Sequence, residues 1–415
     1  MKILSEIWNK SEVLASITVA ISATFLLAGY EFLRSASFSL FKASYGVENL
    51  PFIIAMTPLG VLTVLWIYGK ILTRFGPRKT LSITTLGVCF SILTCYVFIK
   101  FGFKPANAVF FILRECYAAL LVEQFWSFIN SILKESDAKK YNGLILGIAT
   151  TGGIVGGLAV HRFVEALGTQ QLVLIGGLFC IPCWYIAQVA YQISGREHSA
   201  RLKSKTTHDN KVDTFGLSLF VEHRLLLVIS GMILLSQFYS YFVGLNFQEV
   251  IHEQFVDLDR QTAFSGLFFA ITNAASIFAQ FFMTPFLLSR LSISTIHFII
   301  PSVNLLCLSV FWLSPSLYTV SAAFLVYKVM EYSIFRAAKE ILYIPFSFEV
   351  RFRAKELIDV FGHRSGQGIA STLYKFVQSF ISLGKIHTPY LMGAILGLWL
   401  IILIPLRTKE KNNPR

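Results

Sequence analysis

Residues 194–214 read SGREHSARLKSKTTHDNKVDT and interrupt a chain that is apolar on both sides. The stretch carries five Lys or Arg residues, three acidic residues and two histidines, and its larger apolar side chains are Leu202 and Val212. Such a composition is typical of a segment that stays in water. We therefore predict a polar linker at 194–215 between an N-terminal part (1–193) and a C-terminal part (216–415).

The composition of the two flanking parts is that of a membrane protein. Of the 415 residues, 55% are hydrophobic and 14% are charged, and the mean hydropathy is +0.63, whereas soluble domains carry roughly 25% charged residues. Many apolar runs reach roughly 20 residues, enough for a helix to cross about 30 Å of hydrocarbon. We predict an all-α membrane protein with twelve transmembrane helices in two six-helix halves, at about 14–41, 50–69, 79–101, 107–133, 141–162, 170–193, 222–247, 264–289, 293–314, 317–335, 364–386 and 388–406.

The distribution of Lys and Arg predicts the orientation. With the N-terminus inside, and with residues at the span ends counted with the adjoining segments, the inside segments hold 25 of the 36 Lys and Arg residues and the outside loops hold six. Because Lys and Arg accumulate on the cytoplasmic side, we predict that both termini are cytoplasmic, in a bacterial cytoplasmic (inner) membrane. The net charge of +13 then reflects orientation rather than a nucleic-acid-binding face. Two repeated halves with both ends inside are the outline of a secondary transporter.

The loop between the second and third predicted spans reads GKILTRFGPRKTL from Gly69 to Leu81. It resembles the loop signature of the major facilitator superfamily, which has a glycine, an Asp-Arg pair, a second glycine and a basic pair. Thr73 stands where that family usually has the Asp. The alternative is a short basic loop of the kind that follows any span. The resemblance predicts a major-facilitator-like fold.

Several ionisable residues lie inside the predicted spans, where an unpaired charge costs several kcal/mol. They are Glu31 and Arg34 in span 1, Arg114, Glu115 and Glu123 in span 4, Lys328 and Glu331 in span 10, and Lys375 in span 11. Residues three apart share a helix face, so Glu31 and Arg34 can neutralise each other, as can Lys328 and Glu331. One interpretation is ion pairs near span ends. The other is a cavity for an anion, because Arg binds phosphate in a bidentate manner, with the carboxylates as counter-charges or proton carriers.

Two other patterns are better explained by packing than by chemistry. Span 5 carries Gly143, Gly147, Gly153 and Gly157, and small residues four apart allow helix backbones to approach closely. A phosphate-binding loop is the alternative, but the Lys-Ser/Thr of a P-loop does not follow. All six cysteines lie within predicted spans, so we expect small buried residues rather than metal ligands. We predict no metal, no cofactor and no enzymatic activity, since the loops contain no nucleophile–base or metal-ligand set.

Three stretches resemble the ATP/ADP translocase family of nucleotide transporters, found in obligate intracellular bacteria and plastids. They are FWSFIN at 125–130, DAKKYNG at 137–143, and FRAAKEILYIP at 335–345 together with matching positions up to residue 366. The resemblance implies twelve spans, a fold similar to the major facilitator superfamily and exchange or import of nucleotides. It also implies a transport role for Lys339, in the Lys-Glu-x-x-Tyr-Ile-Pro motif.

The match continues at Leu33-Arg34, which looks like a Leu-Arg pair of that family. A basic residue and an Asp usually follow three and four positions later, and this chain has Ser37 and Phe38 there. This chain therefore has one cation fewer here than the translocase pattern. We expect its substrate to be an anion with less charge, or a different nucleotide. After Pro345, which ends a helix, we predict an extended strip at 346–352 and a short amphipathic helix at 354–361.

These observations lead to one main hypothesis: a secondary active transporter that moves a nucleotide or related phosphorylated anion by alternating access, with ATP/ADP exchange as one form. The alternatives are a major-facilitator-type carrier of another organic anion or small metabolite, and a non-transporting membrane scaffold or sensor. The expected partners are a small-molecule anion and the lipid bilayer, with no nucleic acid, and the expected state is a monomer. The predicted substrate-binding residues are Arg34, Arg114, Lys339, Glu31, Glu115, Glu123 and Lys375.

Overall fold

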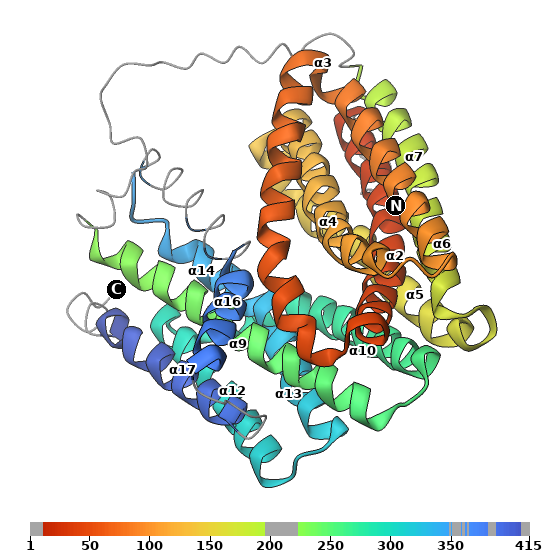
Figure 1. Ribbon diagram of the computed structural model, residues 1–415. Helices are drawn as coiled ribbons and strands as arrows, with labels where there is room; N and C mark the ends of the chain where they lie inside the picture. The colour runs from red at the N-terminus through yellow and green to blue at the C-terminus, as the bar shows by residue number, and fades with distance from the viewer. Residues whose placement is uncertain are drawn as a thin grey trace. The chain divides into compact units, whose positions relative to one another are not determined.

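A computed structural model describes residues 11–195, 223–347, 365–380 and 387–407, together with the single residues 350, 358 and 362 (Figure 1). These residues form helices joined by short turns, and none of them lies in a strand. The predicted all-α class is therefore confirmed. Most of the linker predicted at 194–215, and nearly all of the short helix predicted at 354–361, lie outside the described residues.

Nine helices of the described part are long and apolar enough to cross a membrane. One of them joins two predicted spans, because α3 (Leu50–Lys100) contains a break at Gly76, where φ is 75° and ψ is 169°. Glycine adopts this backbone conformation without a steric penalty, so the chain can turn between two helical segments. Predicted spans 10 and 11 are helical as well, but they fall outside the nine. The count of twelve crossings stays a prediction.

The helices group into two compact units, which we call unit 1 and unit 2. Unit 1 comprises Met1–Asn49, Leu59–Thr206 and Phe255–Ala274. Its described elements are α2 (Ser11–Tyr45), η1 (Val47–Asn49), most of α3, α4 (Pro105–Ile132), α5 (Glu135–Leu167), α6 (Thr169–Leu178), α7 (Cys180–Ile193) and most of α10 (Leu258–Phe278). A helix from the second half of the sequence therefore packs with the helices of the first half.

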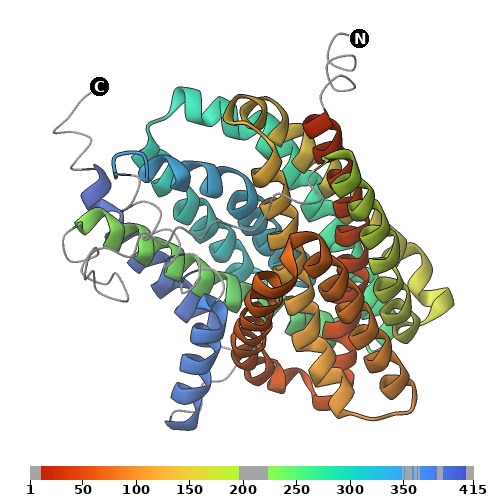
Figure 2. The ribbon, with the colours of Figure 1, turned by 90° about the horizontal axis from the view of Figure 1, so that it is seen from above.

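Helix α2 is the central helix of unit 1. It contacts α4, α5, α6 and α7, and in the view from above it runs between α4 and α7 (Figure 2). Many of its buried residues are small, among them Ala20, Ala23, Ala28 and Gly29. Lipid chains are as apolar as the helix surfaces, so helices in a membrane associate through close van der Waals packing, which small residues permit. The composition of α2 therefore explains its central position.

The glycines of α5 bring it close to two neighbouring helices. A Cβ atom at Gly156 would lie 2.7 Å from the Cα atom of Ala28 on α2, and one at Gly157 would lie 2.7 Å from the carbonyl oxygen of Gly266 on α10. Gly152 likewise leaves no space for a Cβ beside the carbonyl oxygen of Thr24. The close packing predicted for this span is confirmed at Gly153 and Gly157, whereas Gly152 and Gly156 were not part of the predicted pattern. Helix α5 uses two adjacent faces for these contacts.

Unit 2 comprises Leu50–Pro58, Thr207–Gln254 and Ala275–Arg415. Its described elements include α9 (Arg224–Gln254), the π-helical segment η2 (Ala279–Met283), α11 (Thr284–Arg290), α12 (Ile293–Leu313), α13 (Leu317–Met330), the π-helical segment η3 (Glu331–Phe335), α14 (Arg336–Leu342), α16 (Gly366–Phe380) and α17 (Thr388–Ile402). Helix α9 contacts α13, α16 and α17. It is the central helix of unit 2, as α2 is of unit 1.

The surface of both units is apolar where lipid is expected. Large hydrophobic side chains remain exposed on many helices, including Phe90, Phe282, Leu306 and Ile401. Exposed apolar patches of this extent are unusual on soluble proteins, whereas hydrocarbon is a good solvent for them. The chain is a multi-pass integral membrane protein.

Two glycine substitutions test the packing of α5. We expect Gly152→Ala to destabilise the protein by about 1–3 kcal/mol, because the added methyl group overlaps the backbone of α2 and overpacking costs this much. Gly87→Ala is the matched control, since Gly87 lies in a helix with open space around it and should tolerate the methyl group. Thermal unfolding in detergent, followed by a dye that reacts with the buried cysteines, measures both. Equal unfolding temperatures for the two variants would contradict the close approach of α5 to α2.

Candidate functional site

Helix α2 places Glu31 and Arg34 on one face, where they form an ion pair. The Arg34 Nε atom donates to Glu31 Oε2 at 3.1 Å and Nη2 donates to Oε1 at 2.6 Å. The two side chains, Arg34 and Glu31, are 12% and 4% exposed. Two guanidinium nitrogens on one carboxylate give a bidentate pair, which is stronger and more directional than a single contact. The pairing predicted from their spacing is confirmed.

Helix α10 completes this ion pair from the other half of the sequence. Asn273 donates from Nδ2 to Glu31 Oε1 at 2.9 Å, and the guanidinium of Arg34 stacks on Phe269, with 3.4 Å between Cζ and the ring centroid. A cation over an aromatic face is stabilised by the ring quadrupole, most strongly where water is excluded. We call Glu31, Arg34 and Asn273 the unit 1 triad. Its cation is held by a carboxylate and a ring at the same time.

Arg114 on α4 is more deeply buried than Arg34, at 3% exposed. Its Nη2 atom lies 2.9 Å from Glu115 Oε1, and its guanidinium lies over the rings of Phe38 and Phe111 at 4.5 and 4.4 Å. The Nε atom is buried and has no hydrogen-bond partner among the described residues. A buried donor without a partner is costly, so this atom is an uncompensated polar group of unit 1.

Aromatic contacts between α2 and α4 place the two arginines in one region of unit 1. Tyr30 stacks on Tyr117 with 6.4 Å between ring centroids, and Phe38 lies under Arg114. Arg34 lies on α2 between Tyr30 and Phe38, at helical spacing and on the same face. Arg114 therefore contacts α2 at Phe38, one helical turn away from Arg34. Phe38, which replaces an acidic residue of the translocase pattern, here supplies the ring beneath Arg114.

The other predicted site residues of unit 1 are more exposed. The Glu115 side chain is 33% exposed, and Glu123 is exposed on α4. The buried face of α4 instead carries Arg114, Tyr117 and Gln124. The structure therefore pairs Arg34 with Glu31 and Arg114 with Glu115, and it leaves Glu123 exposed on α4.

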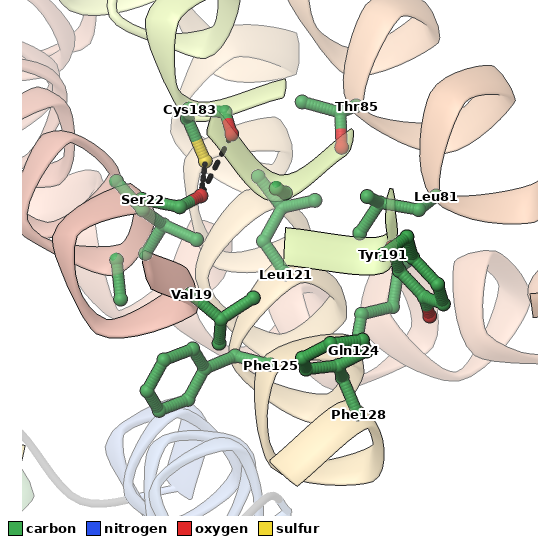
Figure 3. A pocket seen from close by; sticks show the side chains of 13 residues that line it. Val19, Ser22, Leu81, Thr85, Leu121, Gln124, Phe125, Phe128, Cys183 and Tyr191 are labelled. Carbon is green, nitrogen blue, oxygen red and sulfur yellow. Dashed lines mark hydrogen bonds between the residues drawn. The ribbon is translucent and has the colours of Figure 1, made fainter. Parts of the chain in front are cut away.

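A small cavity lies in unit 1, lined by residues of α2, α3, α4 and α7 (Figure 3). Its volume is about 20 Å³, which is space for about one water molecule. The Ser22 hydroxyl donates to the carbonyl oxygen of Cys183 at 2.7 Å beside it. Ligand pockets usually have volumes of about 300–1,000 Å³, so this cavity does not hold an organic substrate.

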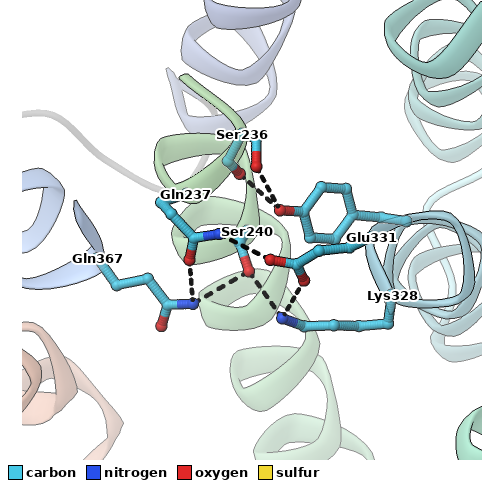
Figure 4. Close-up of polar contacts among 7 residues, drawn as sticks. Ser236, Gln237, Ser240, Lys328, Glu331 and Gln367 are labelled. Atoms are coloured by element: carbon cyan, nitrogen blue, oxygen red, sulfur yellow. Dashed lines mark hydrogen bonds and ion pairs between the residues drawn. The ribbon is translucent and has the colours of Figure 1, made fainter. Parts of the chain in front are cut away.

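Unit 2 contains a second buried polar cluster, which joins α9, α13, η3 and α16 (Figure 4). Lys328 Nζ lies 2.8 Å from Glu331 Oε2 and donates to Ser240 Oγ at 3.0 Å. Gln237 donates from Nε2 to Glu331 Oε1 at 2.7 Å. Gln367 donates from Nε2 to Ser240 Oγ at 3.1 Å. We call Lys328, Glu331 and Gln237 the unit 2 triad. The Lys328–Glu331 pairing predicted from spacing is confirmed.

The two remaining predicted cations also lie in unit 2. Lys339 on α14 is 4% exposed, and its Nζ atom lies 3.9 Å from Glu340 Oε1. This distance is too long for a hydrogen bond, so the contact is a weak ion pair with a carboxylate that is 44% exposed. Lys375 on α16 is half-buried. α14 ends at Leu342, just before Pro345, as that proline predicts.

The sequence patterns pointed to the charged residues but not to their neutral partners. Asn273, Gln237, Ser240 and Gln367 bind the buried charges or extend their networks, and none was predicted as a site residue. Their signal in the sequence was weak, because a neutral amide or hydroxyl in a span costs far less than a charge. Among the described residues, no group of three or more His, Cys, Asp or Glu side chains could hold a metal ion.

Known relatives share part of the sequence. The chain is 23% identical over 343 residues to the ADP,ATP carrier protein 1 of Chlamydia trachomatis, covering 74% of this chain and 64% of that protein. The chloroplastic ADP,ATP carrier protein 1 of Arabidopsis thaliana is 23% identical over 414 residues, covering 88% of this chain and 61% of that protein. The chain thus spans slightly less than two thirds of the length of these relatives. The resemblance predicted from the short motifs is confirmed.

Solved structures of transporters have the same architecture. The nucleoside transporter NupG matches with a TM-score of 0.66 and 11% identity, over 96% of this chain and 99% of that chain. A bacterial homologue of the iron transporter ferroportin, in its inward-facing state, matches with a TM-score of 0.69 and 13% identity, over 95% and 98% of the two chains. The model of the Major Facilitator Superfamily matches residues 8–335. With these matches and this helical architecture, the chain belongs to the Major Facilitator Superfamily.

Proposed function

We propose that the protein is a secondary active transporter that moves a nucleotide or a related phosphorylated anion by alternating access. The observation that carries the proposal is the environment of Arg114, a guanidinium that is 3% exposed, lies over two aromatic rings and has a free Nε donor. Arg is suited to phosphate because its planar fork matches two phosphate oxygens. The similarity to ADP,ATP carriers supports the same class of substrate.

The two arginines of unit 1 have different roles in this proposal. Arg34 is compensated by Glu31, whereas Arg114 has the partly exposed Glu115 as its counter-charge. A phosphate that approaches the pair completes the hydrogen bonding of Arg114 and competes with Glu31 for Arg34. The carboxylates keep the site close to neutral while it is empty, which lowers the cost of burying the cations. In unit 2, Lys339 is the cation to which the translocase resemblance assigns a role in transport.

A second candidate is a carrier of another organic anion or small metabolite. The observation in its favour is that Arg34 and Lys328 each have a carboxylate three residues away in contact, so each cation is neutralised within its own helix. Ser37 and Phe38 add no charge where the translocase pattern has a basic residue and an Asp. An anion with one or two charges is therefore a better fit than a highly charged one. For either substrate class, we propose a monomer in a bacterial inner membrane with both termini in the cytoplasm.

Uptake into proteoliposomes tests the substrate class. We expect the purified protein to exchange internal nucleotide for external labelled ATP or ADP, with saturation and with competition by unlabelled nucleotides. A panel of nucleoside mono-, di- and triphosphates ranks the preferred charge, and nucleosides without phosphate serve as the comparison. Transport of unlike organic anions with no uptake of any nucleotide would instead select the second candidate.

Substitution of Arg114 tests the site itself. We expect Arg114→Lys to raise KM by about tenfold, since lysine keeps the charge but loses the fork, and Arg114→Gln to lower kcat/KM by about a hundredfold, in line with about 2–5 kcal/mol for a buried charged contact. Arg162→Gln is the matched control, because Arg162 is an exposed arginine of α5 in the same unit. Thermal unfolding in detergent shows whether each variant is folded. Unchanged kinetics of folded Arg114→Gln would remove Arg114 from the site.

A further inference from the structure

Helix α3 carries positive charge that the proposed function does not use. Its apolar stretch has the smallest buried share among the nine helices of the described part that could cross a membrane. The 51 residues of α3 contain no Asp or Glu. They contain five cations, which are Lys70, Arg74, Arg78, Lys79 and Lys100. Four of these five cluster around the break at Gly76, so this end of α3 has a net positive charge that no acid of its own helix neutralises.

Exposed side chains follow one face of α3 up to this basic end. Residues three or four positions apart are neighbours on a helix surface, and this spacing continues over five positions. Leu59 and Leu62 begin the row, and Trp66, which is 62% exposed, follows them. Lys70 and Arg74 end the row and are also exposed. The row is therefore apolar at one end, aromatic in the middle and cationic at the other end.

Both cations of the row lie on exposed aromatic rings. Lys70 Nζ is 3.4 Å from the centroid of the Trp66 ring, and Arg74 Cζ is 5.4 Å from the centroid of the Phe75 ring. The quadrupole of each ring stabilises the cation over it without neutralising its charge.

The row also lacks an acidic partner. Thr73 stands between the two cations, where the major facilitator signature has an Asp, and its hydroxyl donates to the Lys70 carbonyl oxygen at 3.0 Å. Neither Lys70 nor Arg74 forms an ion pair with a carboxylate of the described residues. Two positive charges one helical turn apart are thus held at the surface, where an anion from outside the chain can reach them.

The length of the row corresponds to one leaflet of a bilayer. The 15 positions from Leu59 to Arg74 rise by about 22 Å along the helix. Half of a bilayer, with its headgroup region, is about 20–22 Å thick. Tryptophan accumulates at the boundary between hydrocarbon and headgroups. A phospholipid that lies along the row would therefore place its acyl chains against the leucines, its glycerol region at Trp66 and its phosphate at the two cations.

We propose that the row formed by Leu59, Leu62, Trp66, Lys70 and Arg74 is a binding site for an anionic phospholipid. The headgroup phosphate accepts hydrogen bonds from the Lys70 ammonium and the Arg74 guanidinium. A zwitterionic headgroup brings a cation of its own close to these two, so a headgroup with net negative charge binds more tightly. The usual excess of Lys and Arg on one side of a membrane explains the sign of the charge. It does not explain the ring beneath each cation or the alignment of both cations with exposed leucines.

Quenching of Trp66 fluorescence by brominated lipid tests this site in the full-length protein. Two sets of vesicles contain the same mixture of phosphatidylcholine and phosphatidylglycerol, and only the species that carries bromine differs between them. The difference between the wild-type protein and Trp66→Phe isolates Trp66 from the other five tryptophans. We expect the site to prefer phosphatidylglycerol by about thirtyfold, since each cation near an anionic headgroup contributes roughly fivefold.

Two double variants, each measured with and without Trp66, make the result specific. Lys70→Gln/Arg74→Gln should lower the preference to about one, while both brominated lipids still quench Trp66. Lys100→Gln/Lys104→Gln is the matched control, because it removes two exposed cations near the other end of α3, and it should keep the preference. Thermal unfolding in detergent shows that the variants are folded, which we expect because all four altered side chains are exposed.

The outcomes separate a lipid site from its alternatives. Equal quenching of wild-type Trp66 by the two brominated lipids would overturn the proposal. An equal loss of preference in the control variant would also overturn it, because the attraction would then come from the general surface charge. Glycerol 3-phosphate in solution should not displace the lipid, since it has no acyl chains to contact Leu59 and Leu62. Displacement by glycerol 3-phosphate would indicate a site for a soluble phosphate instead. None of these readouts depends on transport, so the proposed function and this inference can fail separately.

Discussion

A charge among membrane-spanning helices needs a partner, and the packing of this protein supplies one. The pair of Glu31 and Arg34 shows how local and distant contacts combine. Spacing along α2 brings the two charges together, but a carboxylate that is 4% exposed needs more than one hydrogen bond to be stable away from water. Asn273 on α10 provides a further bond. Without that contact, part of the desolvation of Glu31 would remain uncompensated.

The glycines of α5 explain how α10 comes within reach of α2. Gly157 contacts the backbone of Gly266, and a Cβ at Gly153 would lie 2.6 Å from the Asn273 amide nitrogen. On its adjacent face, α5 contacts α2 through Gly156. A larger residue at these positions would move α2 or α10 away and lengthen the bond from Asn273 to Glu31. The small residues in this span therefore serve the charged site as well as the packing.

The two triads also show why arginine and lysine are not equivalent here. Arg34 is fixed by its bidentate geometry and by the ring of Phe269, so unit 1 presents a cation in a constant position. Lys328 has one nitrogen, which contacts both Glu331 and Ser240 and lies over the rings of Phe324, Tyr327 and Tyr332. Arg114 is different again, because two rings lie against its guanidinium and one donor stays free.

Features that depend on neighbours within a few turns of one helix could be predicted from the order of the residues. Apolar run length predicted the helices, residues three apart predicted both ion pairs, and glycines four apart predicted the close approach of α5. Tertiary structure decided the partners from elsewhere in the chain: Asn273 lies 242 residues from Glu31, and Gln237 lies 94 residues from Glu331. In the tertiary structure, most of α10 packs within unit 1, and Glu123 is exposed. The physical reason is that helix periodicity fixes which residues share a face, whereas a neutral amide has no periodic signal and acquires its role only when packing brings a buried charge to it.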